Sequence, residues 1–129
     1  MSKNDQIKIK TPQEIEIMKE GGKNLDEIPL ENFIGNAIVI DVSGQKVIED
    51  YLDNIDGADF VFFYTGHAEQ VYSGKYYENN PVISIDIAKR LVKKKIKVVG
   101  IDSFSPDNEP YEVHKLFFEN EILSLENLT

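Results

Sequence analysis

Apolar residues cluster along this chain with two different spacings, and these predict where strands and helices lie. Residues 37–42 (AIVIDV), 59–64 (DFVFFY) and 96–101 (IKVVGI) are short, nearly continuous apolar runs rich in β-branched and aromatic residues. Such runs are typical of strands buried on both faces of a parallel sheet. The segment 122–128 (ILSLENL) predicts a further strand near the end of the chain. Phe60, Phe62 and Phe63 are expected in the core.

Between these runs the apolar positions recur at helical spacing. A helix is expected after Ser84, the capping residue, and its apolar face is formed by Ile85, Ala88, Leu91 and Val92. Residues 45–52 predict a short helix, and residues 111–120 predict another. Strand–helix–strand spacing of this kind favours parallel strands joined by right-handed crossovers. The fold class is therefore α/β, with helices flanking a sheet.

A separate element is predicted near the amino terminus. Thr11, Pro12 and Glu14 form a capping box with proline at the first helical position, and Gly21-Gly22 ends the helix. Before it, residues 7–10 (IKIK) alternate as an edge strand does.

Composition and charge narrow the class of protein. A chain of 129 residues, 41% hydrophobic and 29% charged, is typical of one globular domain. Its formal charge of -9 repels phosphate groups, so neither nucleic acid nor a membrane surface is expected as a partner. The absence of cysteine excludes disulfides and thiolate metal sites. The polar start, MSKNDQIKIK, and the lack of a long apolar run predict a cytoplasmic protein.

The first candidate for chemistry is a histidine paired with a glutamate. Without cysteine, a transition-metal site must use His, Asp and Glu, and the chain has two histidines. His114 lies in the helix expected over 111–120 and Glu126 in the last predicted strand. A helix turning back into a strand brings both side chains to a common point, which is compatible with metal ligation. The alternative is a surface histidine or a hydrogen-bonded core histidine.

A second group of candidates follows the strand over 59–64. His67 and Glu69 would share one face if the chain stayed extended, at the strand end where parallel sheets tend to bind ligands. Tyr72 lies on the same loop, so these three residues are candidate substrate-pocket residues. Tyr72 and its neighbours Tyr76 and Tyr77 could equally contact a partner subunit or pack within the loop. The alternative for His67 is a hydrogen bond to the local backbone.

Four segments, in order, resemble the cyclase family that includes kynurenine formamidase (arylformamidase). They are LDEIPLENFIGNAIVIDV, DFVFFYTG, KRLVKKKIKVVGIDSFSPD and the ending from His114 to the residues ENLT (126–129). The likeness covers residues 22–129 and leaves residues 1–21 outside. It implies a mixed sheet in a swivelling β/β/α-type domain, and a metal-dependent hydrolase of amide or lactam bonds. It also implies zinc or manganese as the cofactor, with His114 and Glu126 as metal ligands.

The departures from this family matter as much as the likeness. Its motif His-x-Gly-Thr-His-x-Asp, which implies the main metal ligands, is absent here, and family members continue beyond the residues ENLT. The segment IKIKTPQEIEIMKEGGK instead resembles the leading helix of methionine aminopeptidases. The resemblance therefore implies a cyclase-like domain truncated at both ends, and no catalytic residue is assigned.

Three functions remain open. The first is a hydrolase domain that is inactive by itself, and the second is a non-catalytic fragment or oligomerisation module. The third is an active enzyme that uses His67, Glu69, His114 and Glu126 on a small-molecule amide substrate. A sheet cut at both ends would expose apolar strand edges and faces, so a homo-oligomer is expected.

Overall fold

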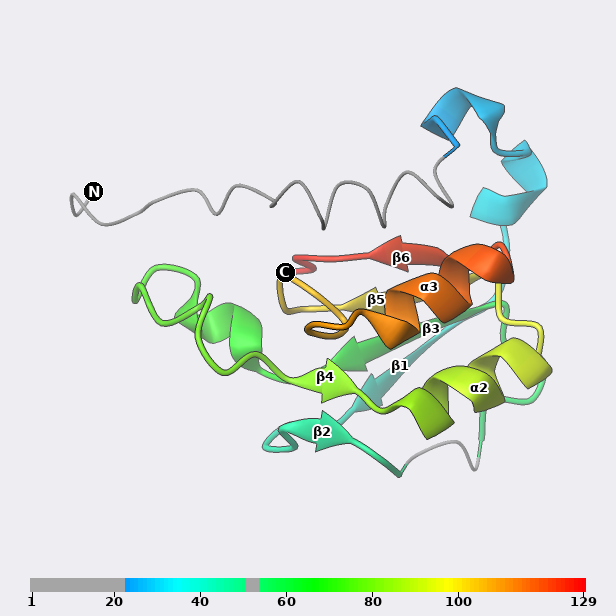
Figure 1. The fold of residues 1–129 in the computed structure, drawn as a ribbon. Coiled ribbons are helices and arrows are strands. Elements are labelled where there is room, and N and C mark those ends of the chain that lie inside the picture. Colours follow the sequence, from blue (N-terminus) through cyan, green and yellow to red (C-terminus); the bar gives the residue numbers. More distant parts are fainter. Residues whose placement is uncertain (1–22, 51–53) are drawn as a thin grey trace.

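A four-stranded parallel sheet, in the order β1-β3-β5-β6, forms the centre of the molecule (Figure 1). The structure is a computed structural model and describes residues 23–50 and 54–129. The strands are β1 (Ala37–Asp41), β3 (Phe60–Tyr64), β5 (Val98–Ile101) and β6 (Leu123–Leu125). The predicted α/β class and all four strands are confirmed. The elements predicted over 7–20, including the aminopeptidase-like helix, lie outside the described residues.

A second, two-stranded parallel sheet joins β2 (Val47–Ile48) to β4 (Val82–Ile83). The helix predicted over 45–52 is therefore wrong at Val47–Ile48, while residues 51–53 are not described. Ile48 is fully buried and pairs with Ile83. Two apolar residues in a short segment do not reveal a period, and the long-range strand partner decides their conformation.

Two α-helices, α2 (Ile85–Lys93) and α3 (Glu112–Glu119), lie on the same face of the large sheet (Figure 1). The predicted cap of α2 is confirmed, because the Ser84 hydroxyl accepts a hydrogen bond from the Ile87 amide at 3.2 Å. Within α2 the buried side chains are Ile87, Ala88 and Leu91, whereas Ile85 and Val92 are partly buried. Short 3-10 helices also lie at Leu25–Glu27, Leu30–Phe33 and His67–Gln70.

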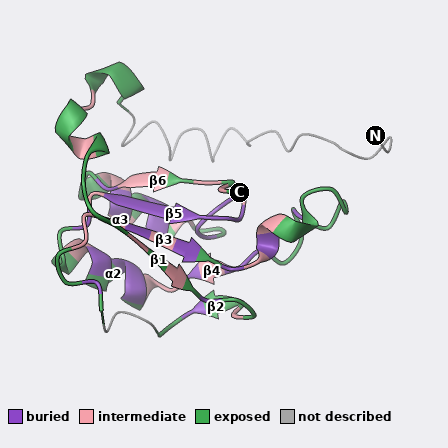
Figure 2. Cartoon of the chain, turned by 180° about the vertical axis from the view of Figure 1, so that it is seen from behind, coloured by how far each residue is buried: buried purple, intermediate pink, exposed green. Residues whose placement is uncertain are grey.

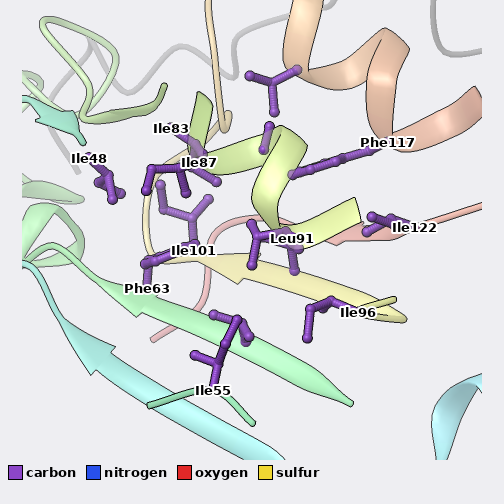
Figure 3. Packing of buried hydrophobic residues seen from close by; sticks show 14 of the residues in the cluster. Ile48, Ile55, Phe63, Ile83, Ile87, Leu91, Ile96, Ile101, Phe117 and Ile122 are labelled. Atoms are coloured by element: carbon purple, nitrogen blue, oxygen red, sulfur yellow. The ribbon is translucent and has the colours of Figure 1, made fainter. Parts of the chain in front are cut away.

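The hydrophobic core fills the space between these helices and the sheet (Figure 3). Phe63 and Ile101 contribute from the strands, Leu91 from α2 and Phe117 from α3, and all four are almost completely buried. This core fixes α3 against α2 and β6, which positions the candidate site. Among the described residues, no helix has the length and apolar character needed to cross a membrane.

The opposite face of the large sheet is not covered by any helix in the described part of the chain (Figure 2). Val39 is 67% exposed on this face and Leu125 is 42% exposed. Phe60 and Phe62 are half-buried, so the expectation that they belong to the core is wrong, and only Phe63 does. The alternation of a strand sends residues 60 and 62 to one face and residues 61 and 63 to the other.

Candidate functional site

The structure brings His114 and Glu126 together. His114 lies in α3 with 4% of its surface exposed, and its Nε2 atom lies 3.2 Å from Glu126 Oε1. Glu126 follows β6 directly rather than lying within it. Because β5 and β6 are parallel, their carboxyl ends lie at the same edge of the sheet. The segment that leads from β5 into α3 and the residue that follows β6 therefore both lie at this edge. The proximity predicted from the sequence is confirmed.

A third side chain, Asp107, completes this group and was missed by the sequence analysis. Its Oδ1 atom bonds His114 Nδ1, and its Oδ2 atom accepts the amides of Val113 at 2.8 Å and His114 at 3.3 Å. Asp107 thus caps α3 from outside the helix. Tyr111, at the N-cap position, makes no side-chain cap. Sequence rules for capping consider the residue at the N-cap position, so they do not identify Asp107, which lies four positions before Tyr111.

The surroundings of His114 favour its charged form. Burial by itself lowers the pKa of this imidazole, but the hydrogen bonds to Asp107 and Glu126, together with their negative charges, raise the pKa to about 9. Ionised carboxylates only accept hydrogen bonds, so both ring nitrogens donate. In the metal-free protein His114 is therefore an imidazolium at neutral pH, held between two carboxylates.

The segment that carries Glu126 is held by a buried tyrosine. The Tyr76 hydroxyl donates to Asn127 Oδ1 at 2.8 Å, and Tyr76 is 3% exposed. The backbone N–H of Asn127 in turn donates to the Ser103 carbonyl at 2.8 Å. Burial and the charge of Asp102 raise the pKa of Tyr76 to about 12, so its hydroxyl stays protonated and can donate.

In the structure His67, Glu69 and Tyr72 lie in different surroundings. Gly66, with φ of 80°, turns the chain at the end of β3, and the next residues form a 3-10 turn instead of continuing extended. His67 is buried, and its Nε2 donates to the Tyr76 carbonyl at 2.6 Å, which is the local backbone contact left open as its alternative. Glu69 accepts from the Tyr64 hydroxyl at 3.2 Å, and Tyr72 is 92% exposed. That His67, Glu69 and Tyr72 bind substrate stays a prediction.

The donor set around His114 fits part of a divalent metal site. One imidazole nitrogen and one carboxylate face each other, and a second carboxylate holds the other ring nitrogen, as outer carboxylates commonly do for metal-bound histidines. Catalytic zinc normally has three protein ligands. Among the residues described, no group of three His, Cys, Asp or Glu side chains is placed to hold one ion. These residues therefore do not fit a complete catalytic metal centre.

The fold and this site define an α/β domain with a carboxylate-flanked histidine near the carboxyl ends of parallel strands. Residues 14–108 match the family described as "Putative cyclase". This chain belongs to that cyclase family. The match begins before residue 22, the start of the likeness seen in the sequence, and ends before His114 and Glu126. The division into residues 1–21 and 22–129 stays a prediction.

Two solved structures share the fold. The first, described as "The Structure Of Potential Metal-Dependent Hydrolase With Cyclase Activity", is 27% identical, with a TM-score of 0.71 over 84% of this chain. The second, a "predicted metal-dependent hydrolase from Bacillus stearothermophilus", is also 27% identical, with a TM-score of 0.67 over 86% of this chain. This chain spans 56% of the length of each. The comparison with curated proteins gave no match.

Proposed function

We propose that this chain is a cyclase-type hydrolase domain that contributes His114 and Glu126 to a divalent metal site but does not hydrolyse amide bonds by itself. The observation that supports the metal site is the distance of 3.2 Å between His114 Nε2 and Glu126 Oε1, together with the bond of Asp107 to the other ring nitrogen. The similarity to two solved structures described as metal-dependent hydrolases supports the choice of a metal. Zinc and manganese are the candidate ions.

The inactivity follows from the number of ligands. A catalytic metal lowers the pKa of its bound water and polarises the substrate carbonyl, and the protein must hold it tightly in a fixed geometry to do so. Two ligands leave an ion mostly hydrated and weakly held. The described residues offer no third ligand next to this pair.

Metal binding is tested by titrating the chelator-treated protein with Zn²⁺ and Mn²⁺ in a calorimeter. Wild type is expected to bind one ion weakly, and Glu126→Gln and His114→Ala are expected to abolish binding. Glu119→Gln is the matched control, because Glu119 is an exposed residue at the end of α3. Equal binding by Glu126→Gln and wild type would show that the ion sits elsewhere.

Hydrolysis is tested separately with N-formylkynurenine as a representative amide substrate, with and without added Zn²⁺ or Mn²⁺. We expect no metal-dependent turnover. Turnover that requires metal and disappears in His114→Ala would contradict the proposed inactivity. His67 and Glu69 would then be the next ligands to substitute.

A second role, as a module that assembles with copies of itself, is favoured by the uncovered face of the sheet. Val39, Tyr64 and Leu125 are exposed there, and parallel sheets usually have both faces covered. Burying apolar surface contributes about 25 cal/mol per Å². The formal charge of -9 opposes association only over the screening distance of about 8 Å at physiological salt.

Light scattering across a dilution series tests this assembly. We expect a mass above 14.7 kDa that falls on dilution, and a monomer when Val39 and Leu125 are both changed to serine. A wild-type mass of 14.7 kDa at every concentration would refute the homo-oligomer.

A further inference from the structure

The orientation of a histidine ring on a helix is not fixed by the helix alone, because two side-chain bonds can rotate. In this protein Asp107 bonds the Nδ1 atom of the His114 ring, which leaves the Nε2 atom facing Glu126. Tyr111 and Phe118 contact the ring edge-on, each with a centroid distance of 5.8 Å. The imidazole is thus confined to one orientation.

The same carboxylate fixes the first turn of the helix. Asp107 Oδ2 accepts the amides of Val113 and His114, whereas Oδ1 bonds the His114 ring. The backbone and the side chain of His114 are therefore anchored on one residue. With 7% of its surface exposed, Asp107 is itself buried. A change in this carboxylate would alter both the start of α3 and the direction of the ring.

On the other side, the position of Glu126 depends on the residue that follows it. Asn127 adopts a left-handed conformation with φ of 57°, which turns the chain directly after Glu126. The Tyr76 hydroxyl bonds the Asn127 side chain at 2.8 Å. Tyr76 is fixed in turn, because its ring stacks on His67 at 5.1 Å and its carbonyl accepts from His67 Nε2.

We propose that Asp107 and Tyr76 are positioning residues that hold the two candidate metal ligands facing each other. Asp107 acts through the ring of His114, and Tyr76 acts through Asn127 on the turn that carries Glu126. This inference rests on the proposed function for its metal-binding consequence, but the geometry itself can be tested without metal. Substituting groups that orient metal ligands typically costs 10–100-fold in metal affinity.

The first experiment observes the rings directly, in metal-free protein. The chain has two histidines, so ¹⁵N-histidine labelling gives an uncrowded NMR spectrum. The Nδ1 proton of His114 should be slow to exchange and shifted downfield, and the ring should show contacts to the Glu126 side chain. The Nε2 proton of His67, bonded to the Tyr76 carbonyl, is the internal reference.

Asp107→Asn separates positioning from capping. Asparagine keeps one side-chain oxygen for the helix amides, but its amide group cannot accept the Nδ1 proton as the second carboxylate oxygen does. We expect the protected Nδ1 proton of His114 to be lost while the His67 signal and the circular dichroism spectrum stay unchanged. Should this variant fail to fold, Asp107→Glu, which keeps the charge and displaces the carboxylate, provides the same comparison.

The second experiment measures Co²⁺ affinity and the visible Co²⁺ spectrum. Asp107→Asn and Tyr76→Phe should each weaken binding about tenfold or more and change the spectrum, since the coordination geometry changes. Tyr77→Phe is the matched control, because Tyr77 contacts the Tyr76 ring edge-on at 5.3 Å and is 43% exposed. It should leave the affinity and the spectrum unchanged.

The outcomes distinguish this inference from the proposed function. If wild type does not bind Co²⁺, the proposed metal role fails, and the NMR contacts alone decide the positioning role. The inference is overturned if Asp107→Asn retains the protected Nδ1 proton. It is also overturned if Tyr76→Phe leaves the contacts between His114 and Glu126 as in wild type.

Discussion

The pairing of His114 with two carboxylates should make the free energy of unfolding of the metal-free protein fall as the pH rises above neutrality. Its pKa is raised from 6.5 to about 9 in the folded protein. Each pH unit of difference between the folded and unfolded pKa corresponds to about 1.4 kcal/mol. The full effect is therefore about 3 kcal/mol. Only 4% of His114 is exposed, so solvent screens the interaction little.

The sign follows from which state holds the proton more tightly. The folded protein binds the His114 proton more strongly than the unfolded chain, so this contribution is fully present below about pH 6.5. Between pH 6.5 and 9 the unfolded chain loses the proton while the folded protein keeps it. The stabilisation declines over this window and is lost as the pH rises through about 9.

Urea unfolding between pH 6 and 9.5, in the presence of a chelator, measures this effect. The wild-type free energy of unfolding should fall by about 3 kcal/mol more than that of His114→Gln, which cannot titrate. Subtracting the variant removes the general repulsion within an acidic chain. Parallel pH profiles for the two proteins would show that the buried ion pairs do not raise the pKa of His114.

Three substitutions test the packing that supports the site, each by urea unfolding. Phe117→Ala should cost about 3–5 kcal/mol, because this fully buried ring joins α3 to the core, and a loss below 1 kcal/mol would contradict that. Ser84→Ala should cost about 1 kcal/mol by removing the cap of α2, whereas an unchanged midpoint would show that the cap is not needed. Gly100→Ala should cost about 1–3 kcal/mol, since the added Cβ would lie 2.5 Å from Phe62 Cδ1 and 2.7 Å from Leu128 Cδ1. A stabilised Gly100→Ala protein would refute this close packing.

The sequence alone determined the elements that have a clear local pattern, either a continuous apolar run or a capping residue. The β-branched runs at 37–42, 59–64 and 96–101 predicted β1, β3 and β5, because such runs are typical of strands in a parallel sheet. Burial on both faces is confirmed only for β5, since β1 and β3 have one face that no helix covers among the described residues. Ser84 marked the start of α2 through its side-chain cap. The pairing of His114 with Glu126 also followed from sequence, since the family likeness identified both residues and the helix-to-strand spacing allowed their approach.

Tertiary contacts decided what local patterns could not. Ile48 became a strand residue because Ile83, 35 positions away, offers a partner. His67 turned inward onto the Tyr76 carbonyl because Gly66 bends the chain after β3. Asp107 has its role through the geometry of the turn before α3, which brings its carboxylate to the Val113 and His114 amides and to the His114 ring. Strand partners and side-chain hydrogen bonds depend on how the folded chain turns and which segments it brings together, and the local apolar pattern does not contain that information.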